Sequence, residues 1–340
     1  MRPLEIILIA GSIALFFAVN AKDGPASNTW SIGRGSDATG VRWEVDRRHG
    51  NSHWRSSNTV PWSRFKGLTL DDLNRGGALK FEYVGEAGSL LCEGKMQLVR
   101  GASGPFTFRP NPAFGDELVK LGYTGRATED ELFNFAMHGV SLELARALAE
   151  GPGPASPRDL EKLAIHGIDA VYLRDVRAAG YAKLTVEDFV KARIHGVEPR
   201  FLTAIKGAGY DLDMDRMVEL RIHGVSIDYL NELRDNGLKP DARELVQLKI
   251  HGVSAALLKA MADSGYRVSD AGDAVELKIH GVSPDFIRDV KALGYQLPAR
   301  VLVQFRIHGV DAAYLKRLAG SGYANLTPEK IVKLKIHGVD

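Results

Sequence analysis

The chain has 340 residues, of which 45% are hydrophobic and 25% are charged, and this composition excludes a chain that is disordered throughout. Its 44 basic and 42 acidic residues nearly cancel, leaving a formal net charge of +2, so no strong general attraction to nucleic acid or to an anionic membrane is expected. The length is sufficient for two compact units.

The first residues carry the pattern of an export signal. Arg2 precedes an apolar run from Ile6 to Val19, and small residues follow around Ala21. We therefore predict a signal peptide at residues 1–21, cleaved near Ala21, and an exported protein that is periplasmic or extracellular. The run is shorter than the about 20 residues that cross a bilayer, so an N-terminal membrane anchor is the weaker alternative and no membrane span is expected after cleavage.

Residues 22–110 are predicted to form a small antiparallel β-module, either a sandwich or a barrel. The segments VRWEVD and LKFEYV alternate apolar and polar residues, as half-buried strands do. Glycine-rich breaks at 75–77, 86–88 and 100–104 are expected to form hairpin turns. Cys92 is the only cysteine, so no intramolecular disulfide forms, and its alternating neighbours predict a small core residue.

One basic stretch of the β-module, RRHGNSHWR, is the candidate for ligand binding in this part of the chain. We interpret it as an irregular polar loop, and its side chains would suit an anionic or glycan ligand. The candidate binding residues are Arg47, Arg48, His49, His53, Trp54 and Arg55.

From residue 111 the chain repeats one unit. Within residues 111–340 the pair His-Gly occurs eight times, at intervals of 28, 29, 28, 28, 29, 28 and 29 residues, which indicates a helical solenoid over this region. We assign these residues a structural role, in which the histidine ends one helix and the glycine supplies its left-handed cap. They are His138, His166, His195, His223, His251, His280, His308 and His337, followed by Gly139, Gly167, Gly196, Gly224, Gly252, Gly281, Gly309 and Gly338.

Each repeat is predicted to fold as a hairpin of two short helices. In the repeat that starts at His280, Ser283 is the expected N-cap of the first helix and Gly294 its expected end. The second helix opens with a capping box where Thr185 is followed by Asp188. The positions six, five, three and one before each histidine are mostly apolar, and we predict that this stripe is buried between neighbouring repeats.

The predicted fold class is therefore α+β, with a small β-sandwich or barrel followed by an all-α solenoid of eight helical hairpins. The histidines are not expected to share a metal ion, because equivalent atoms in successive repeats lie about 10 Å apart. No metal and no cofactor is expected. The last hairpin, which includes Ile331 and Leu334, is expected to be partly open and to permit self-association.

A basic residue stands two positions before the histidine in six repeats. We interpret these residues as complements to the negative end of the helix dipole on a solvated face, with a basic stripe for an acidic ligand as the alternative. They are Arg193, Arg221, Lys249, Lys278, Arg306 and Lys335.

ELKIHGVSPDFIRDVKALGY, residues 276–295, resembles helical repeats of the form IHGV-[ST]-P-[DE]-[FY]-I found in bacterial envelope proteins, some joined to BlaR/MecR-like sensor metallopeptidases. The similarity extends over residues 111–340, and GSLLCEGKMQLVRGASGPFTFRPNPAF is similar to the β-module that precedes such repeats. The resemblance implies an envelope sensor or interaction role. The chain contains no His-Glu-x-x-His, so the peptidase part is missing and no zinc proteolysis is implied.

These observations predict a non-enzymatic exported scaffold that binds another protein in the bacterial cell envelope, as part of a sensor or signalling system. One alternative is a ligand- or glycan-binding β-module with the solenoid as a spacer. The other is a nucleic-acid-binding repeat protein, because the turn resembles the helix-hairpin-helix motif and LTPEKIV resembles the repeats of TAL effectors. Asp169, Glu198 and Asp311 at the turns would repel phosphate, so no nucleic-acid partner is expected.

Overall fold

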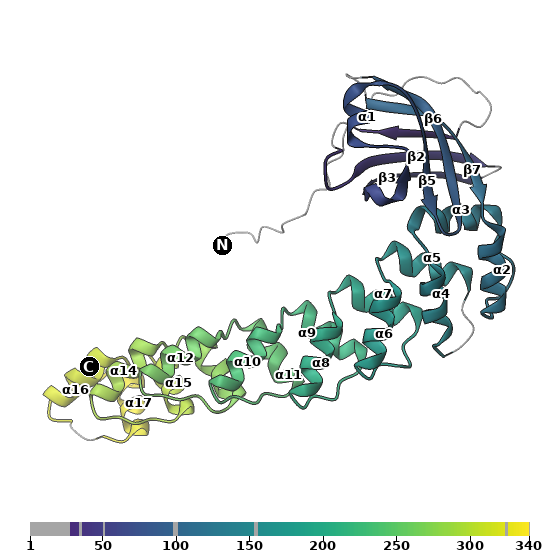
Figure 1. Cartoon of the computed structure of the whole chain (residues 1–340). Helices are drawn as coiled ribbons and strands as arrows, with labels where there is room; N and C mark the ends of the chain where they lie inside the picture. The colour runs from purple at the N-terminus through teal and green to yellow at the C-terminus, as the bar shows by residue number, and fades with distance from the viewer. Residues whose placement is uncertain are drawn as a thin grey trace. The chain divides into compact units, whose positions relative to one another are not determined.

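The computed structural model describes residues 28–339, except 34–35, 50–51, 98–100, 153–155 and 324–325 and the side chains of 49 and 52. The predicted signal peptide lies outside the described residues. The chain forms two compact units: the first takes in the chain up to Pro112 together with Thr128–Met137, and the second comprises Ala113–Ala127 and the chain from His138 onward. The predicted α+β class is confirmed, with an antiparallel sheet followed by helices in series (Figure 1).

The first unit is built on one antiparallel sheet of seven strands, in the order β3-β2-β1-β7-β6-β5-β4. The strands are β1 (Thr29–Ile32), β2 (Val41–His49), β3 (Ser52–Val60), β4 (Phe65–Lys66), β5 (Gly77–Gly85), β6 (Gly88–Gln97) and β7 (Gly101–Pro110). The chain also forms a single 3-10 turn, η1 (Trp62–Arg64), and a short helix, α1 (Leu70–Arg75). The sheet curls into a half-barrel (Figure 1), so the module is not a sandwich of two stacked sheets.

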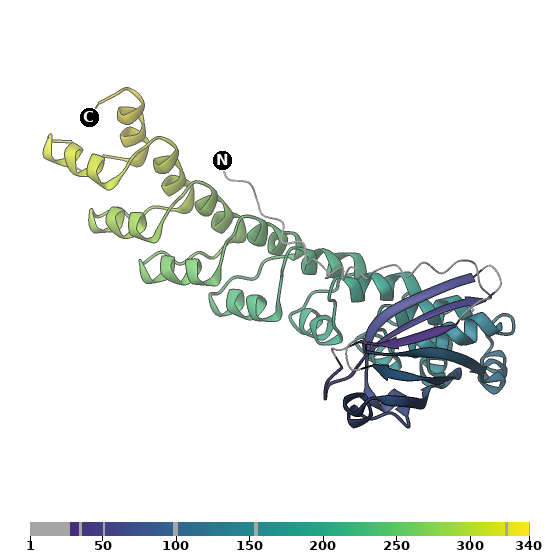
Figure 2. The same cartoon turned by 90° about the horizontal axis from the view of Figure 1, so that it is seen from above.

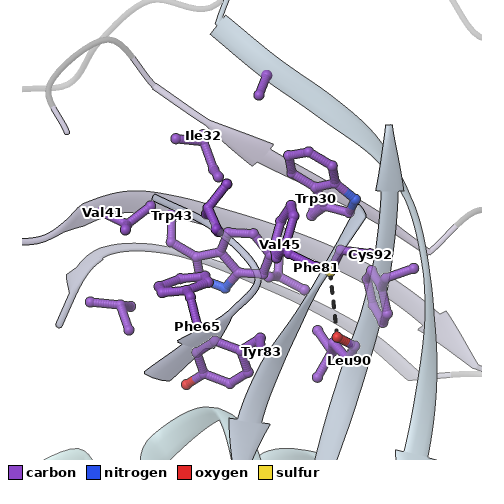
Figure 3. Close-up of a cluster of buried hydrophobic side chains, with 14 of the residues drawn as sticks. Trp30, Ile32, Val41, Trp43, Val45, Phe65, Phe81, Tyr83, Leu90 and Cys92 are labelled. Carbon is purple, nitrogen blue, oxygen red and sulfur yellow. Dashed lines mark hydrogen bonds between the residues drawn. The ribbon is translucent and has the colours of Figure 1, made fainter. Parts of the chain in front are cut away.

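Aromatic side chains form the core of this sheet (Figure 3). Trp43 on β2 stacks on Tyr83 of β5 with ring centroids 5.7 Å apart, and Trp30 on β1 meets Phe81 of β5 edge-on at 4.8 Å. In a flat sheet β2 and β5 would lie about 19 Å apart, since neighbouring strands are about 4.8 Å apart. The contact between these rings therefore requires the sheet to curl, and it explains why alternate residues of both strands are apolar.

Cys92 on β6 belongs to the same core, as predicted. Its side chain is buried, and its Sγ lies 3.7 Å from the backbone carbonyl oxygen of Leu90. Burial raises the pKa of the Cys92 thiol far above its ordinary value, so the reactive thiolate is disfavoured.

The turn predicted at 100–104 is wrong for the described part of that segment, because Gly101 to Gly104 lie inside β7. Gly104 pairs with Trp30 of β1, and a side chain at Gly104 would collide with the backbone of Glu93 on β6. Glycine is required here because two strands approach closely, and the sequence pattern does not distinguish this cause from a turn.

One helix of the repeat region packs in the first unit. This helix, α3 (Glu129–His138), places the fully buried ring of Phe133 edge-on against Trp54 of β3 and Phe108 of β7, with centroids 5.3 and 5.2 Å apart. Met137 belongs to the same core cluster. The core of the half-barrel is thus completed by the second helix of the first hairpin.

A buried arginine attaches α3 to the sheet. Arg47 on β2 is only 4% exposed, and its guanidinium binds Glu129 at 2.9 Å and Asp130 at 2.8 Å. The same group lies over the rings of Phe108 and Phe133, 5.6 and 4.3 Å from their centroids. Ion pairing and ring stacking therefore offset the cost of burying the cation.

The second unit is a series of short helices in two rows (Figures 1 and 2). The helices from residue 112 are α2 (Pro112–Lys120), the α3 already described, α4 (Leu142–Ala149), α5 (Pro157–Ile165), α6 (Ala170–Ala178), α7 (Val186–Ile194), α8 (Pro199–Gly207), α9 (Met214–Ile222), α10 (Ile227–Asp235), α11 (Ala242–Ile250), α12 (Ala255–Asp263), α13 (Ala271–Ile279), α14 (Pro284–Ala292), α15 (Ala299–Ile307), α16 (Ala312–Gly320) and α17 (Pro328–Ile336). From α4 to α16 each even-numbered helix contacts the next even-numbered one, and from α5 to α17 the odd-numbered helices do the same. The eight predicted hairpins are confirmed, and those of the second unit stack on their neighbours as in a solenoid.

The helix caps follow the signals read from the sequence. The side chain of Ser283 accepts a hydrogen bond from the N–H of Phe286 at 3.1 Å, and Thr185 and Asp188 form the predicted capping box. Helices of about ten residues are unstable alone, so these caps act together with the stacking of the rows.

The last described hairpin is more closed than predicted. Ile331 on α17 is fully buried, which contradicts the prediction that it is partly open, whereas Leu334 is half-buried. Ile331 stands six positions before His337, and this position is buried in every described odd-numbered helix from α5 to α17. The regular packing of α17 on α15 therefore covers it.

Candidate functional site

The chain leaves each hairpin through a His-Gly turn, which valine follows in seven repeats and Ile168 in the other. After α11, His251 ends the helix, Gly252 has a φ of +66°, and the N–H of Val253 donates to the carbonyl oxygen of Leu248 at 2.8 Å. This is the left-handed glycine cap that the sequence predicts. A residue with a Cβ is strained at such a φ, which explains the glycine in each repeat.

The histidines beside these turns are only partly accessible: His195 and His337 are exposed, and the other six are half-buried. The Nε2 of His280 is 3.3 Å from Glu276, and the Nε2 of His308 is 3.2 Å from Gln304, in each case one helical turn earlier. Among the described residues there is no group of three or more His, Cys, Asp or Glu side chains that could hold a metal ion.

A tyrosine hydroxyl fastens three of the turns to the first helix of the same hairpin. Tyr229 on α10 donates to the carbonyl oxygen of Val253, the residue that follows Gly252, at 2.8 Å. Tyr172 makes the same bond to Val197, and Tyr314 to Val339, also at 2.8 Å each. The turn follows the second helix of the hairpin, and these bonds hold it against the first helix.

The basic residue two positions before the histidine connects neighbouring hairpins. Arg221, near the end of α9, lies 5.1 Å from the ring centroid of Phe201 on α8 and donates to the carbonyl oxygen of Gly196 at 3.0 Å. Gly196 belongs to the turn that ends α7, so the cation complements the negative end of the helix dipole of the preceding hairpin. The same ring contact is made by Arg193, Lys249, Arg306 and Lys335.

Burial of the tyrosines should make the array sensitive to high pH. Burial raises the pKa of Tyr172 and of Tyr229 to about 12 each. An unfolded tyrosine ionises near pH 10, so this contribution to stability is complete below about pH 10 and is lost as the pH rises through about 12. We expect the midpoint of urea unfolding, followed by circular dichroism at 222 nm, to fall over this range.

Tyr229→Phe should reduce that alkaline loss, and at neutral pH it should destabilise the array by about 1 kcal/mol because the bond to Val253 is lost. Tyr323→Phe, a change at an exposed tyrosine, serves as the control and should alter neither quantity. An alkaline loss of the same size in Tyr229→Phe would contradict this assignment.

The isoleucine directly before each histidine is exposed, which contradicts the prediction that the whole apolar stripe is buried. Seven residues form this row, and their exposed fractions lie between 49% and 60%. They are Ile165, Ile194, Ile222, Ile250, Ile279, Ile307 and Ile336. We call this row the isoleucine ladder. The corresponding residue of the first repeat, Met137, is buried in the first unit.

Helix geometry explains why the ladder faces solvent. Ile250 lies seven residues after Arg243 and three after Gln247, and both of these residues are exposed. Positions seven apart differ in direction by only about 20° on an α-helix, so Ile250 shares a face with Arg243 rather than with the buried Leu245 and Leu248. This polar neighbour seven positions earlier is the signal in the sequence that could have revealed the exposure.

The ladder position also differs from the buried positions in its uniformity. It is isoleucine in all seven repeats, whereas the buried position two residues earlier varies, with Ala192, Leu248 and Phe305 among its residues. Isoleucine is a weaker helix former than leucine, lysine or glutamate, so helix propensity does not favour it at an exposed site. Single exposed apolar residues are common on protein surfaces, so it is the uniformity of this row that distinguishes it.

The predicted binding patch of the sheet is not a single patch. The described residues of RRHGNSHWR lie at the end of β2 and the start of β3, so the prediction of an irregular loop is wrong for them. Arg47 stands opposite Trp54, and Arg48 stands opposite His53. Because successive residues of a strand face opposite sides, Arg47 and Trp54 face α3 while Arg48, His53 and Arg55 lie on the other face. The side chain of His49 lies outside the described residues.

The charges on that other face are paired within the sheet. His53 Nε2 is 3.1 Å from Asp46, and Arg55 binds Glu44 at 3.1 Å. Arg47 is occupied by Glu129 and Asp130. Arg47 and Trp54 therefore belong to a buried contact, whereas His53 and Arg55 are paired on the surface.

In the part of the chain that the structure describes, no helix combines the length and the apolar character needed to cross a membrane. Comparisons with protein-family models and with curated protein sequences find no match.

Proposed function

We propose that this protein is a non-enzymatic interaction scaffold, in which the helical array presents the isoleucine ladder to another protein. The observation that supports this function is the exposure of the same aliphatic residue at one position in seven successive hairpins. Stacked repeats present extended surfaces of this kind, and an exposed apolar row is a feature of protein contacts.

The contacts beside the ladder support a preformed surface. Ile250 lies three residues before Val253, whose carbonyl oxygen accepts from Tyr229, and Ile222 follows Arg221, which binds the preceding turn. These contacts fix the backbone next to Ile250 and Ile222. A partner would therefore bind without ordering the ladder first, which lowers the entropic cost of binding.

We place this scaffold in the bacterial cell envelope, as part of a sensor or signalling assembly. Two features of the sequence support this location: the predicted signal peptide at residues 1–21, and the resemblance of residues 111–340 to the repeats of envelope proteins.

A photo-reactive amino acid at Gln247 tests the proposed function, because Gln247 is exposed one helical turn before Ile250. Irradiation of the native cells should give a covalent adduct with another protein. Ile222→Glu combined with Ile250→Glu should reduce the adduct by about tenfold or more, because two aliphatic contacts of on the order of 1 kcal/mol each are replaced by buried charge.

The matched control adds the same two charges at exposed positions away from the ladder, as Val119→Glu on α2 combined with Asn231→Glu on α10. This variant should form the adduct at the original level. Failure to form any adduct, or an adduct that persists in the ladder variant, would refute the proposal.

A further inference from the structure

The spacing of the isoleucine ladder points to the kind of partner that fits it. Neighbouring helices in a packed row lie about 8 to 10 Å apart, and each ladder residue occupies the same position on its helix, so successive ladder side chains are separated by about 10 Å. Seven residues of an α-helix advance about 10.5 Å and return to nearly the same face. We infer that the ladder binds an amphipathic α-helix with apolar residues at every seventh position, an inference that rests on the proposed interaction function.

An extended peptide does not match this spacing. Side chains on one face of a strand recur about every 6.7 Å, so they meet only every second ladder residue. A helix remains in step over several intervals, and its apolar residues can pack beside each ladder isoleucine. The seven ladder residues span six intervals, or about 60 Å, which corresponds to a helix of about 40 residues.

A second copy of the described chain does not supply such a helix. The longest described helix, α3, has ten residues, and the ladder-bearing helices α5 to α17 have nine each. A nine-residue helix is about 13.5 Å long and covers only one interval of the ladder. Because no helix in the described part of this chain is long enough, we assign the ladder to a different protein with a longer helix.

The charged residues beside the ladder indicate which charge the partner helix should carry next to its apolar face. From four positions before the histidine to the histidine itself, the seven ladder repeats carry nine basic and two acidic residues. The basic residues are Lys162, Lys191, Arg193, Arg221, Lys249, Lys278, Arg306, Lys333 and Lys335, and the acidic residues are Glu219 and Glu276. Eight positions before the histidine the charges balance, with Arg158, Arg243 and Arg300 against Glu187, Asp215 and Glu329.

Some of these bases have partners within the array. Lys162 binds Glu187, and Lys191 binds Asp215, in each case on the next odd-numbered helix. Arg193 also binds Glu198, and the other six basic residues still outnumber Glu219 and Glu276 along the ladder. Complementary charge orients a partner more than it adds affinity, so the partner helix should carry acidic residues beside its apolar seam.

Two synthetic peptides of about 28 residues test the inference against the full chain. The first repeats an acidic amphipathic heptad four times, and the second has the same composition and helical propensity but no apolar residue repeated at seven. Fluorescence anisotropy should show that the heptad peptide binds about tenfold or more tightly than the permuted peptide. Ile222→Glu combined with Ile250→Glu should abolish this difference, whereas Val119→Glu combined with Asn231→Glu should retain it.

Each other outcome overturns the inference. Equal binding of the two peptides, or binding of neither, excludes a seven-residue period. Ladder-dependent binding to vesicles containing anionic lipid, in place of the peptide, would identify a membrane surface as the partner. Ladder-dependent sedimentation as a dimer would identify a second copy. If Gln247 gives adducts in cells but neither peptide binds, the helical partner is refuted while the scaffold stands, and failure of both experiments refutes both proposals.

Discussion

Leu248→Ala should destabilise the helical array by about 3 kcal/mol, whereas Ile250→Ala, two residues further along α11, should change its stability by less than about 1 kcal/mol. Leu248 is 0% exposed, and its removal leaves a cavity between packed helices that the surroundings fill only in part. Ile250 is 53% exposed, so alanine loses little buried area there. The better helix propensity of alanine offsets part of that loss.

Urea unfolding followed by circular dichroism at 222 nm measures this difference, because most described helices belong to the array. Leu277→Ala and Ile279→Ala repeat the comparison on α13, where Leu277 is buried and Ile279 is exposed. The stack couples neighbouring repeats, so the comparison uses the shift of the midpoint in each variant. Equal losses at the two positions would contradict the exposure of the ladder.

This comparison also separates stability from binding. A partner contact at Ile250 is expected to be lost in Ile250→Glu without unfolding, because the side chain is not needed for packing in the free protein. Leu248→Ala should lower stability without removing a partner contact, because Leu248 supports the helix and does not reach the exposed face. If the loss of binding in each variant simply followed its loss of stability, the ladder would have no special role in binding.

Arg47→Ala should destabilise the first unit by about 2 to 4 kcal/mol. The guanidinium fills the space between the rings of Phe108 and Phe133 and attaches α3 through Glu129 and Asp130. The two carboxylates are themselves partly exposed, so they return to water when the arginine is removed, and the loss comes mainly from the vacated space and the missing ring contacts.

Arg47→Met tests that explanation, because methionine fills a similar volume without a charge. It should recover more than half of the lost stability, as an apolar residue often replaces a buried ion pair at small cost. Arg48→Ala, on the opposite face of β2, is the matched control and should change stability by less than about 0.5 kcal/mol. If methionine destabilised as much as alanine, the ion pairs rather than the packing would dominate.

Tryptophan fluorescence follows this unit selectively. All four tryptophans of the chain, Trp30, Trp43, Trp54 and Trp62, lie in the first unit. Their unfolding transition should shift in Arg47→Ala. The circular dichroism signal at 222 nm, which comes mainly from the second unit, should shift less.

The amino-acid sequence alone determined the features that depend on residues close together in the chain. The interval between His-Gly pairs predicted eight hairpins, and all eight are present. The caps at Ser283 and Thr185 and the left-handed turn at Gly252 followed from hydrogen bonds that span only a few residues. The alternation around Cys92 likewise placed it in the core.

Only the tertiary structure decided which surfaces these elements cover. Arg47 meets Asp130 across 83 positions of the chain, and no local pattern in the sequence marks such a pair. The apolar pattern predicts that the isoleucine ladder is buried, yet the direction of each helix in its row leaves it exposed. Helix caps and repeats can be predicted from short stretches of sequence because their hydrogen bonds join residues close together in the chain. Burial depends instead on the direction from which distant segments approach.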